Sequence, residues 1–217
     1  MEGMPSQSAS SALIIHNGGY ASLLASLMLE SEANAAESSV GRRSLIYAWI
    51  PPTGCGLFAD EPPYTRGAVS ALTRTEMVGR QAGLFGFREV FTEAQPASRD
   101  RPSVASLLLR AMELAADHRC ERVIWPICVG SDLDHLHRVT ERAALITELA
   151  ALDFPLAQGS GGDCIRLSIP LADFTHTMLD DMGDDLDAPI EACWRPVGDL
   201  AASESRAEPE YRAEVRS

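Results

Sequence analysis

The sequence predicts an α/β domain built on a doubly wound parallel sheet of about five strands. Short apolar runs alternate along the chain with longer segments in which apolar residues recur at helical spacing. A glycine pair, Gly18 and Gly19, separates the first apolar run from the first helical segment. The composition, with 46% apolar and 23% charged residues, is that of an ordinary globular chain. Strand–helix alternation of this kind favours parallel strands covered by helices on both faces.

Strands are expected where apolar runs end at glycine, proline or polar residues, and helices where the spacing becomes helical. The predicted strands cover residues 12–16, 44–50, 88–92, 122–129 and 164–169. The predicted helices cover residues 20–35, 69–84, 102–117, 134–152 and 174–182. In the first helix Leu23, Leu24, Leu27 and Met28 share one face, and Pro102 stands in the first turn of the third, where its missing N–H costs nothing.

Residues 11–197 are predicted to form a single domain, because 217 residues supply enough apolar surface for one core. We expect a disordered lead-in at residues 1–10 and a polar, flexible tail at residues 198–217. Residues 53–68 are rich in glycine and proline and are predicted to form a lid or an ordered loop. No apolar run approaches the roughly 18 residues of a membrane span, and the start lacks a signal-peptide pattern. A cytoplasmic location without a membrane partner is therefore expected.

The formal charge is −13, and all 18 basic residues are arginines. A negative chain is not expected to bind duplex nucleic acid non-specifically, because such binding neutralises phosphates with cations. A small anion held by backbone N–H groups remains compatible with this charge. The five cysteines have none of the close spacing of a zinc knuckle, and we interpret them as reduced thiols, mostly in the core.

Ligands of doubly wound sheets bind beyond the carboxyl ends of the strands, near the point where strand order reverses. The candidate site therefore includes residues 16–22, residues from Pro51 onward and residues 129–134. Within it the turn at residues 17–22 is the most specific element. Two glycines between a strand and a helix let the backbone approach a ligand, and the free N–H groups of a helix start attract anions. The alternative is a plain strand-to-helix turn.

Four segments carry a resemblance to known proteins. Residues 17–22, Asn-Gly-Gly-Tyr-Ala-Ser, resemble the Ser-Gly-Gly-x-Asp-Ser phosphate loop of the PP-loop ATP pyrophosphatases. Residues 74–76, Arg-Thr-Glu, are similar to the Arg-x-Glu of one branch, the 7-cyano-7-deazaguanine synthases of queuosine biosynthesis. Residues 169–171, Ile-Pro-Leu, and 189–194, Pro-Ile-Glu-Ala-Cys-Trp, resemble that branch's Thr-Pro-Leu and Glu-x-Thr-x-Cys-Tyr segments. The segments keep their order over about residues 12–196.

The resemblance implies an adenine-nucleotide alpha-hydrolase-like fold, ATP as cofactor and an AMP-forming reaction. Enzymes of this branch adenylate a carboxylate on a deazapurine and let ammonia displace AMP. Carried over by position, the nucleotide would contact Asn17, Gly18, Gly19, Tyr20 and Ser22, with Arg101 as a displaced remnant of a Pro-Gly-Arg-Asn motif. Magnesium is compatible with this reaction.

The departures from the family pattern imply a degenerate member, a pseudoenzyme with weak or altered chemistry. Ala21 replaces the phosphate-loop aspartate, and His176 falls at or near the family's phosphate-contacting lysine. Cys193 is the last cysteine, so the family's zinc cluster is missing, zinc is not expected, and Trp194 is expected to hold the carboxyl-terminal region down. Removing oriented charges from phosphate chemistry costs several kcal/mol.

His16 and His176 are the candidates for replacing the lost lysine and are our predicted catalytic residues. His16 ends the first predicted strand, where a histidine contacts a phosphate, acts as a base or is simply a satisfied polar residue. Asp132 and Asp134 follow the fourth strand, where the family reads its substrate, and are the predicted substrate-binding residues. A metal there is an alternative, and so is plain N-capping of the next helix.

Two further motifs are given structural interpretations. The run Gly-Ser-Gly-Gly-Asp at residues 159–163 lies before a strand, on the wrong edge of the sheet for a phosphate loop, and is predicted to be a turn. The aspartates at residues 180–187 are predicted to be a solvated acidic face.

Three functional hypotheses follow. The leading one is a diverged deazaguanine-synthase-like protein that binds a nucleotide or purine-like ligand. The second is a non-catalytic scaffold that keeps the fold as a platform for a homodimer or a partner protein. The third is an enzyme active on a different acid, using His176 and a metal held by Asp132 or Asp134.

Overall fold

The structure, a computed structural model, describes residues 11–41, 43–52, 55–58, 71–93, 102–154 and 164–194. The predictions for residues 1–10, 159–163 and 198–217, for Arg101 and for most of residues 53–68 lie outside this described part. Its strands are β1 (Ala12–Ile15), β2 (Ile46–Ile50), β3 (Glu89–Thr92), β4 (Arg122–Ile124) and β5 (Arg166–Ser168). All neighbouring strands pair in parallel, in the order β3-β2-β1-β4-β5. The predicted fold class, a doubly wound parallel sheet of five strands, is confirmed.

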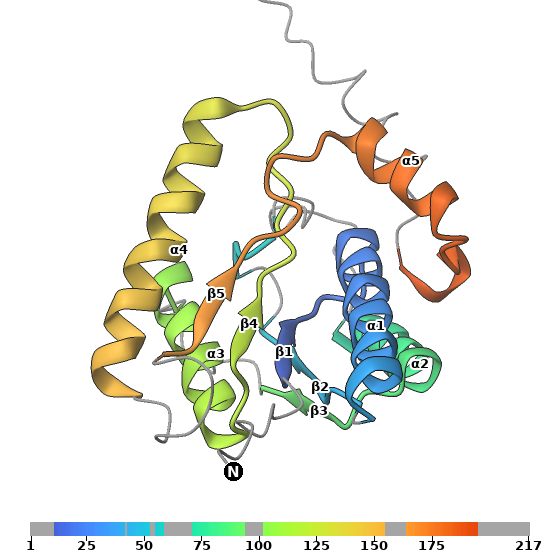
Figure 1. The fold of residues 1–217 in the computed structure, drawn as a ribbon. Coiled ribbons are helices and arrows are strands. Elements are labelled where there is room, and N and C mark those ends of the chain that lie inside the picture. Colours follow the sequence, from blue (N-terminus) through green and yellow to red (C-terminus); the bar gives the residue numbers. More distant parts are fainter. Residues whose placement is uncertain are drawn as a thin grey trace, which may run out of the picture.

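Helices cover both faces of the sheet (Figure 1). Helices α3 (Val104–Asp117) and α4 (Leu133–Asp153) lie on one face. Helices α1 (Tyr20–Val40), α2 (Ala71–Phe85) and α5 (His176–Asp185), with the 3-10 helix η1 (Ile190–Ala192), lie on the other. Among the described residues no helix is both long enough and apolar enough to cross a membrane.

Strand alternation divides the core between the two faces. In β1, Leu13 and Ile15 pack with α3 and α4, whereas Ala12 and Ile14 pack with α1 and α2. All four side chains are almost fully buried, as expected for the central strand of a covered parallel sheet. The same alternation directs the next even-numbered side chain, His16, into the α1 and α2 layer.

Most predicted boundaries differ from the structure by one or two residues, and three elements show larger or locally explained differences. The fourth strand was expected to reach residue 129 but ends at Ile124, because Pro126 has no N–H to donate and Ile127 N bonds to Trp125 O instead. The first helix continues to Val40, where Gly41, at φ 71°, ends it in the left-handed conformation. The last predicted helix begins two residues late, at His176, because the Thr175 side chain caps it, and it runs on to Asp185.

Candidate functional site

The glycine turn, residues 16–19, lies where doubly wound folds hold their ligands. It follows the central strand β1 directly and leads into α1 (Figure 1). Strand order reverses between β1 and its neighbour β4, so the turn stands at the switch point of the sheet. Its place in the fold therefore matches the predicted site.

Hydrogen bonds from its own side chains close the turn. Gly18 N donates to His16 Nδ1 over 3.0 Å, and Gly19 N donates to Asn17 Oδ1 over 2.9 Å. Ser22 Oγ donates to the same Asn17 oxygen over 2.9 Å. The two glycine N–H groups that a phosphate loop would offer to its ligand are thus engaged within the chain.

His16 was expected to point toward the carboxyl edge of the sheet. Its side chain is instead fully buried in the α1 and α2 layer. Ser26 Oγ donates to Ser22 O over 2.7 Å and lies 3.3 Å from His16 Nε2. Because His16 Nδ1 accepts from Gly18 N–H, the neutral ring carries its proton on Nε2, and the serine oxygen accepts a hydrogen bond from Nε2–H. Burial lowers the pKa of His16 to about 3, Gln81 opposes this by a hydrogen bond, and the charge of Arg74 lowers it further. The neutral ring supports the turn, and a pKa this low does not suit a general base at neutral pH.

Three side chains from distant segments cover the turn. Trp194 Nε1 donates to Asn17 O over 2.7 Å, and Trp194 N donates to Gly18 O over 3.1 Å. Gln81 Nε2 bonds to Ala192 O over 2.8 Å, while Arg74 Nε bonds more weakly to Asn17 O over 3.4 Å. Trp194 is half-buried, and its hydrogen bonds attach the carboxyl-terminal end of the described chain to the turn.

Gly18 needs to be glycine for two reasons. Its φ of +79° is in the left-handed region, and a Cβ there would lie 3.0 Å from Trp194 Cδ1 and 3.1 Å from Met77 Cβ. Gly19, at φ −83° and ψ −179°, has ordinary extended backbone. The glycine pair is therefore explained partly by the packing of Trp194 on the turn.

The turn is the centre of the buried polar network of the described chain. The buried polar and charged side chains of the described residues are His16, Asn17, Ser22, Ser26, Arg74 and Gln81. Ser26 and Gln81 were not among the predicted site residues. Their spacing held a signal, because Ser26 is four residues from Ser22 and Gln81 seven from Arg74, which places each pair on one helix face.

The start of α1 combines a favourable helix dipole with unfavourable neighbouring charges. No side chain caps the helix, and its first turn has no acidic residue, so its amino terminus attracts anions. However, burial and then the charges of Asp180, Asp184 and Cys193 raise the pKa of Tyr20 to about 12. The α5 carboxylates therefore make the surroundings of this helix start negative, which suits a phosphate only when a cation accompanies it.

The predicted substrate residues belong to the start of α4. Asp132 is exposed and N-caps α4, its Oδ1 accepting from His135 N over 2.9 Å, and Asp134 is exposed in the first turn. His137 pairs with Glu141 over 3.2 Å on the same helix. Among the described residues no group of three metal-ligating side chains is found. The capping interpretation therefore accounts for the contacts of Asp132.

His176, the other predicted catalytic residue, is half-buried at the first position of α5. Its charge lowers the pKa of Asp180, although burial, the larger effect, raises it, together with the charges of Asp184 and Asp181. Tyr20 links α5 to the glycine turn, because its hydroxyl donates to Leu179 O over 3.3 Å. His176 therefore belongs to the acidic surroundings of the α1 start.

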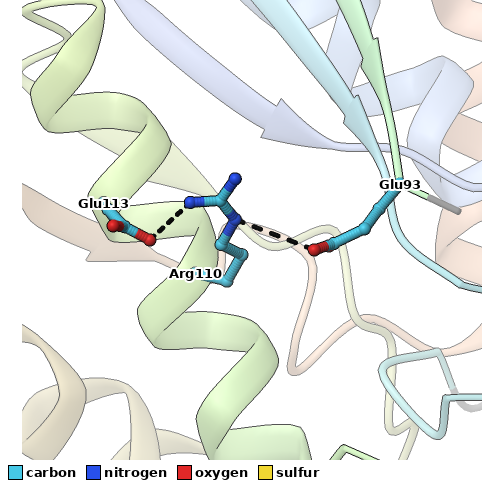
Figure 2. A network of polar contacts seen from close by, with 3 residues as sticks. All are labelled: Glu93, Arg110 and Glu113. Atoms are coloured by element: carbon cyan, nitrogen blue, oxygen red, sulfur yellow. Dashed lines mark hydrogen bonds and ion pairs between the residues drawn. The ribbon is translucent and has the colours of Figure 1, made fainter. Parts of the chain in front are cut away.

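Arg110 is a cation near the carboxyl end of β3. Its Nη1 lies 2.5 Å from Glu113 Oε2 on α3, and its Nε lies 3.8 Å from Glu93 Oε1, just after the strand (Figure 2). Two carboxylates therefore share this guanidinium. It fastens α3 to the edge of the sheet and is not positioned as a spare phosphate ligand.

No protein-family model matches the sequence, and a search of curated proteins found no match. A search of solved structures found distant similarities. They include the U34-tRNA thiolase NcsA from Methanococcus maripaludis, at 12% identity and TM-score 0.47 over 94% of this chain and 68% of that one. An NAD+ synthetase from Burkholderia pseudomallei matches at 17% identity and TM-score 0.37, over 88% and 65%. An N,N'-diacetylchitobiose deacetylase from Pyrococcus horikoshii matches at 11% and 0.41, over 93% and 77%. This chain thus spans about two thirds of the length of the first two proteins, and at these identities its function has to be argued from its own residues.

Proposed function

We propose that this chain is a diverged PP-loop protein, similar to the 7-cyano-7-deazaguanine synthases, that binds a nucleotide or purine-like ligand at the start of α1. One observation carries the proposal. Segments that resemble this family, although far apart in the sequence, meet around the glycine turn. Arg74 and Trp194 both bond to Asn17 O, and Leu171 is buried in the same core cluster as Tyr20. Separate matches that gather at one place support a common architecture for the site.

The ligand in this proposal enters from the carboxyl edge and places its anionic part against the first turn of α1. The helix dipole and the uncapped helix start favour an anion there. The Asn17 side chain now holds Gly19 N–H and has to turn away before a phosphate oxygen can take that bond. A magnesium ion bound with the nucleotide would offset the charges of Asp180 and Asp184.

Adenylation of an acid would be weak or altered in such a protein. Ala21 has no carboxylate to organise magnesium and phosphate, and the sequence has no lysine. The buried, neutral His16 does not replace that lysine. Each lost charged contact costs several kcal/mol of transition-state stabilisation, so binding without fast turnover is the expected outcome.

Thermal unfolding with and without millimolar ATP, AMP and magnesium tests the proposal. Selective binding stabilises the folded state by about 2.7 kcal/mol at a hundredfold excess of ligand over Kd. We expect a rise in Tm with nucleotide and magnesium that Gly19→Val abolishes, because valine would block the backbone at the turn. Gly79→Val, at an exposed glycine inside α2 with nothing within 4 Å of an added Cβ, serves as the matched control and should keep the nucleotide effect.

The second candidate is a non-catalytic scaffold, and the closed turn favours it. The N–H groups of both glycines are bonded to neighbouring side chains, and the turn is buried, so the segment is complete without a ligand. No Tm change with any nucleotide would refute the binding proposal and leave this one. AMP release with magnesium and candidate acids would refute the scaffold candidate, and fast release would favour an active enzyme for a different acid over the weak or altered chemistry of the leading proposal.

A further inference from the structure

Trp194 holds the two peptide groups of the glycine turn whose N–H groups a ligand would use. Asn17 O accepts from Trp194 Nε1 over 2.7 Å, and Gly18 O accepts from Trp194 N over 3.1 Å. The N–H of the first of these peptide groups, that of Gly18, donates to His16 Nδ1. The N–H of the second, that of Gly19, donates to Asn17 Oδ1. Because a trans peptide group is planar, with its N–H and C=O pointing in opposite directions, Trp194 fixes the direction of both N–H groups.

The two side chains that accept these N–H groups are enclosed, whereas Trp194 is not. The exposed fraction of His16 is 0% and that of Asn17 is 1%, so neither side chain borders the solvent. Trp194 is half-buried, and its ring lies so close to the turn that a Cβ at Gly18 would be 3.0 Å from Trp194 Cδ1. Trp194 is therefore the outer part of this arrangement, and opening of the turn has to begin with it.

The backbone of the closed turn does not require glycine at position 19. Gly19 has φ −83° and ψ −179°, an extended conformation that any residue adopts. Glycine matters there when the peptide group between Gly18 and Gly19 rotates, because the dihedral angles on both sides of that group then belong to glycines. The glycine pair therefore suits a turn that has two states, one of which is the closed state described above.

We propose that residues 190–194, the Trp194 strap, hold the glycine turn closed, and that release of Trp194 opens the turn for the anionic part of the ligand. The identity of this ligand rests on the proposed function. Two longer bonds from α2, from Arg74 Nε to Asn17 O over 3.4 Å and from Gln81 Nε2 to Gly18 O over 3.5 Å, do not involve the strap. The open turn thus keeps its attachment to α2. A ligand of the open state binds with an affinity reduced by the fraction of molecules that are open.

Amide hydrogen exchange of the full chain, without any ligand, tests the strap itself. Trp194→Phe keeps an aromatic ring and the backbone N–H at this position but removes the Nε1 donor. We expect the variant to speed exchange at the N–H groups of Gly18 and Gly19 about tenfold, as the loss of one hydrogen bond of ordinary strength allows. The amides of β1 should keep their rates, because the opening is local.

Trp125→Phe is the matched control. Trp125 also donates from Nε1 to a backbone carbonyl, Leu57 O, over 2.6 Å, but it packs in the other core cluster, with α3 and α4. Its replacement acts on the glycine turn only through overall stability, so any change should be the same at the two glycines as in β1. Unchanged exchange at the two glycines in Trp194→Phe, or an equal selective acceleration in Trp125→Phe, would overturn the proposal.

Nucleotide binding gives a second readout. Trp49 and Trp125 are almost fully buried, so Trp194 is the one of the three tryptophans that acrylamide reaches readily. We expect millimolar ATP with magnesium to increase acrylamide quenching in the wild type but not in Trp194→Phe. The variant should also bind the nucleotide more tightly, by the same factor of about ten as its exchange rates, because both measure the open fraction.

Weaker nucleotide binding by Trp194→Phe would mean that Trp194 contacts the ligand, and it would overturn the strap proposal. If neither protein binds a nucleotide, the nucleotide proposal fails, and the exchange rates at the two glycines alone decide for or against the strap. Failure of the strap and failure of the proposed function are thereby distinguished.

Discussion

His16 and Asn17 make the same kind of hydrogen bond at successive positions of the glycine turn. Each side chain accepts a hydrogen bond from the backbone N–H two residues on, at Gly18 and Gly19 respectively. This local pattern gives the chain a sharp turn between β1 and α1 without leaving buried N–H groups unpaired. The histidine can act in this way only while Nδ1 is unprotonated, so the turn depends on the protonation state of His16.

Acid should destabilise this protein through His16. The pKa of His16 is about 3 in the folded state, below the ordinary value of 6.5. Between these two pH values His16 is protonated in the unfolded chain but not in the folded chain. The contribution of His16 is complete above pH 6.5 and is lost as the pH falls toward 3. The slope is about 1.4 kcal/mol per pH unit. Urea unfolding at several pH values between 7 and 4 measures this loss.

The matched variant is His16→Asn, because asparagine also accepts from the N–H two residues on and does not titrate. Its stability should fall less steeply with acid than that of the wild type, while the carboxylates contribute equally to both proteins. The exposed His137, replaced by Asn, controls for removing a histidine as such. Parallel pH profiles for wild type and His16→Asn would show that His16 is not the group responsible.

At the scale of elements, helix α5 packs closely on α1 at Tyr20. A Cβ at Gly183 of α5 would overlap the Tyr20 hydroxyl of α1. Tyr20 is almost fully buried and its hydroxyl also bonds to Leu179 O. Glycine inside a helix is ordinarily unfavourable, so its presence at position 183 is explained by the packing of the two helices.

Gly183→Ala should therefore destabilise the fold by about 1–3 kcal/mol, the usual cost of overpacking. Gly79→Ala is the control, because Gly79 lies in the interior of α2 with nothing within 4 Å of an added Cβ. That change should stabilise the protein by about 0.5–1 kcal/mol through helix propensity alone. Denaturant unfolding of both variants measures the two effects, and equal signs would contradict this account of the α5 packing.

The elements could be predicted well because their signals are local. The apolar runs around Ile14 and Ala48 mark covered parallel strands. The end of α1 was placed too early, at residue 35, although Gly41 was the local signal for it. The predicted fourth strand was too long because the residues after Ile124 are apolar, like those of a strand. Trp125 and Ile127 are indeed buried, although they lie outside the strand. Pro126, which interrupts the ladder between them, was the signal that should have ended it.

The location of the candidate site was predictable, but its closed state was not. A glycine pair after the first strand fixes where the turn lies, since strand order and helix position follow from the α/β pattern. The bond from Trp194 to Asn17 joins residues 177 positions apart, and no local pattern indicates it. The direction of His16 did follow from strand alternation, and counting by twos from the buried Ala12 and Ile14 would have given it.

At the scale of the whole molecule, charge bears on which ligand the proposed nucleotide site would accept. The chain has a formal charge of −13, and the carboxylates of α5 lie close to the start of α1. A bare polyphosphate meets a negative field there, whereas a magnesium complex does not. The residue that would hold magnesium in the family pattern falls at Ala21, which is half-buried in the first turn of α1.

Restoring the family residues at two positions should therefore strengthen nucleotide binding. Asn17→Ser shortens the side chain that now holds Gly19 N–H, and Ala21→Asp supplies the missing carboxylate. We expect the double variant to bind ATP with magnesium roughly ten- to a hundredfold more tightly than the wild type, as one added charged contact allows. Isothermal titration with and without magnesium measures the change.

The control for this variant is Asn17→Ser with Ala21→Asn, which has nearly the same shape and no added charge. If the new carboxylate acts through magnesium, only the aspartate form gains affinity, and it does so only when the metal is present. Equal binding by the two forms would mean that opening Gly19 N–H is the whole effect. No gain in either form would mean that the cover of Trp194 over Asn17 and Gly18, rather than the lost residues, keeps nucleotides out.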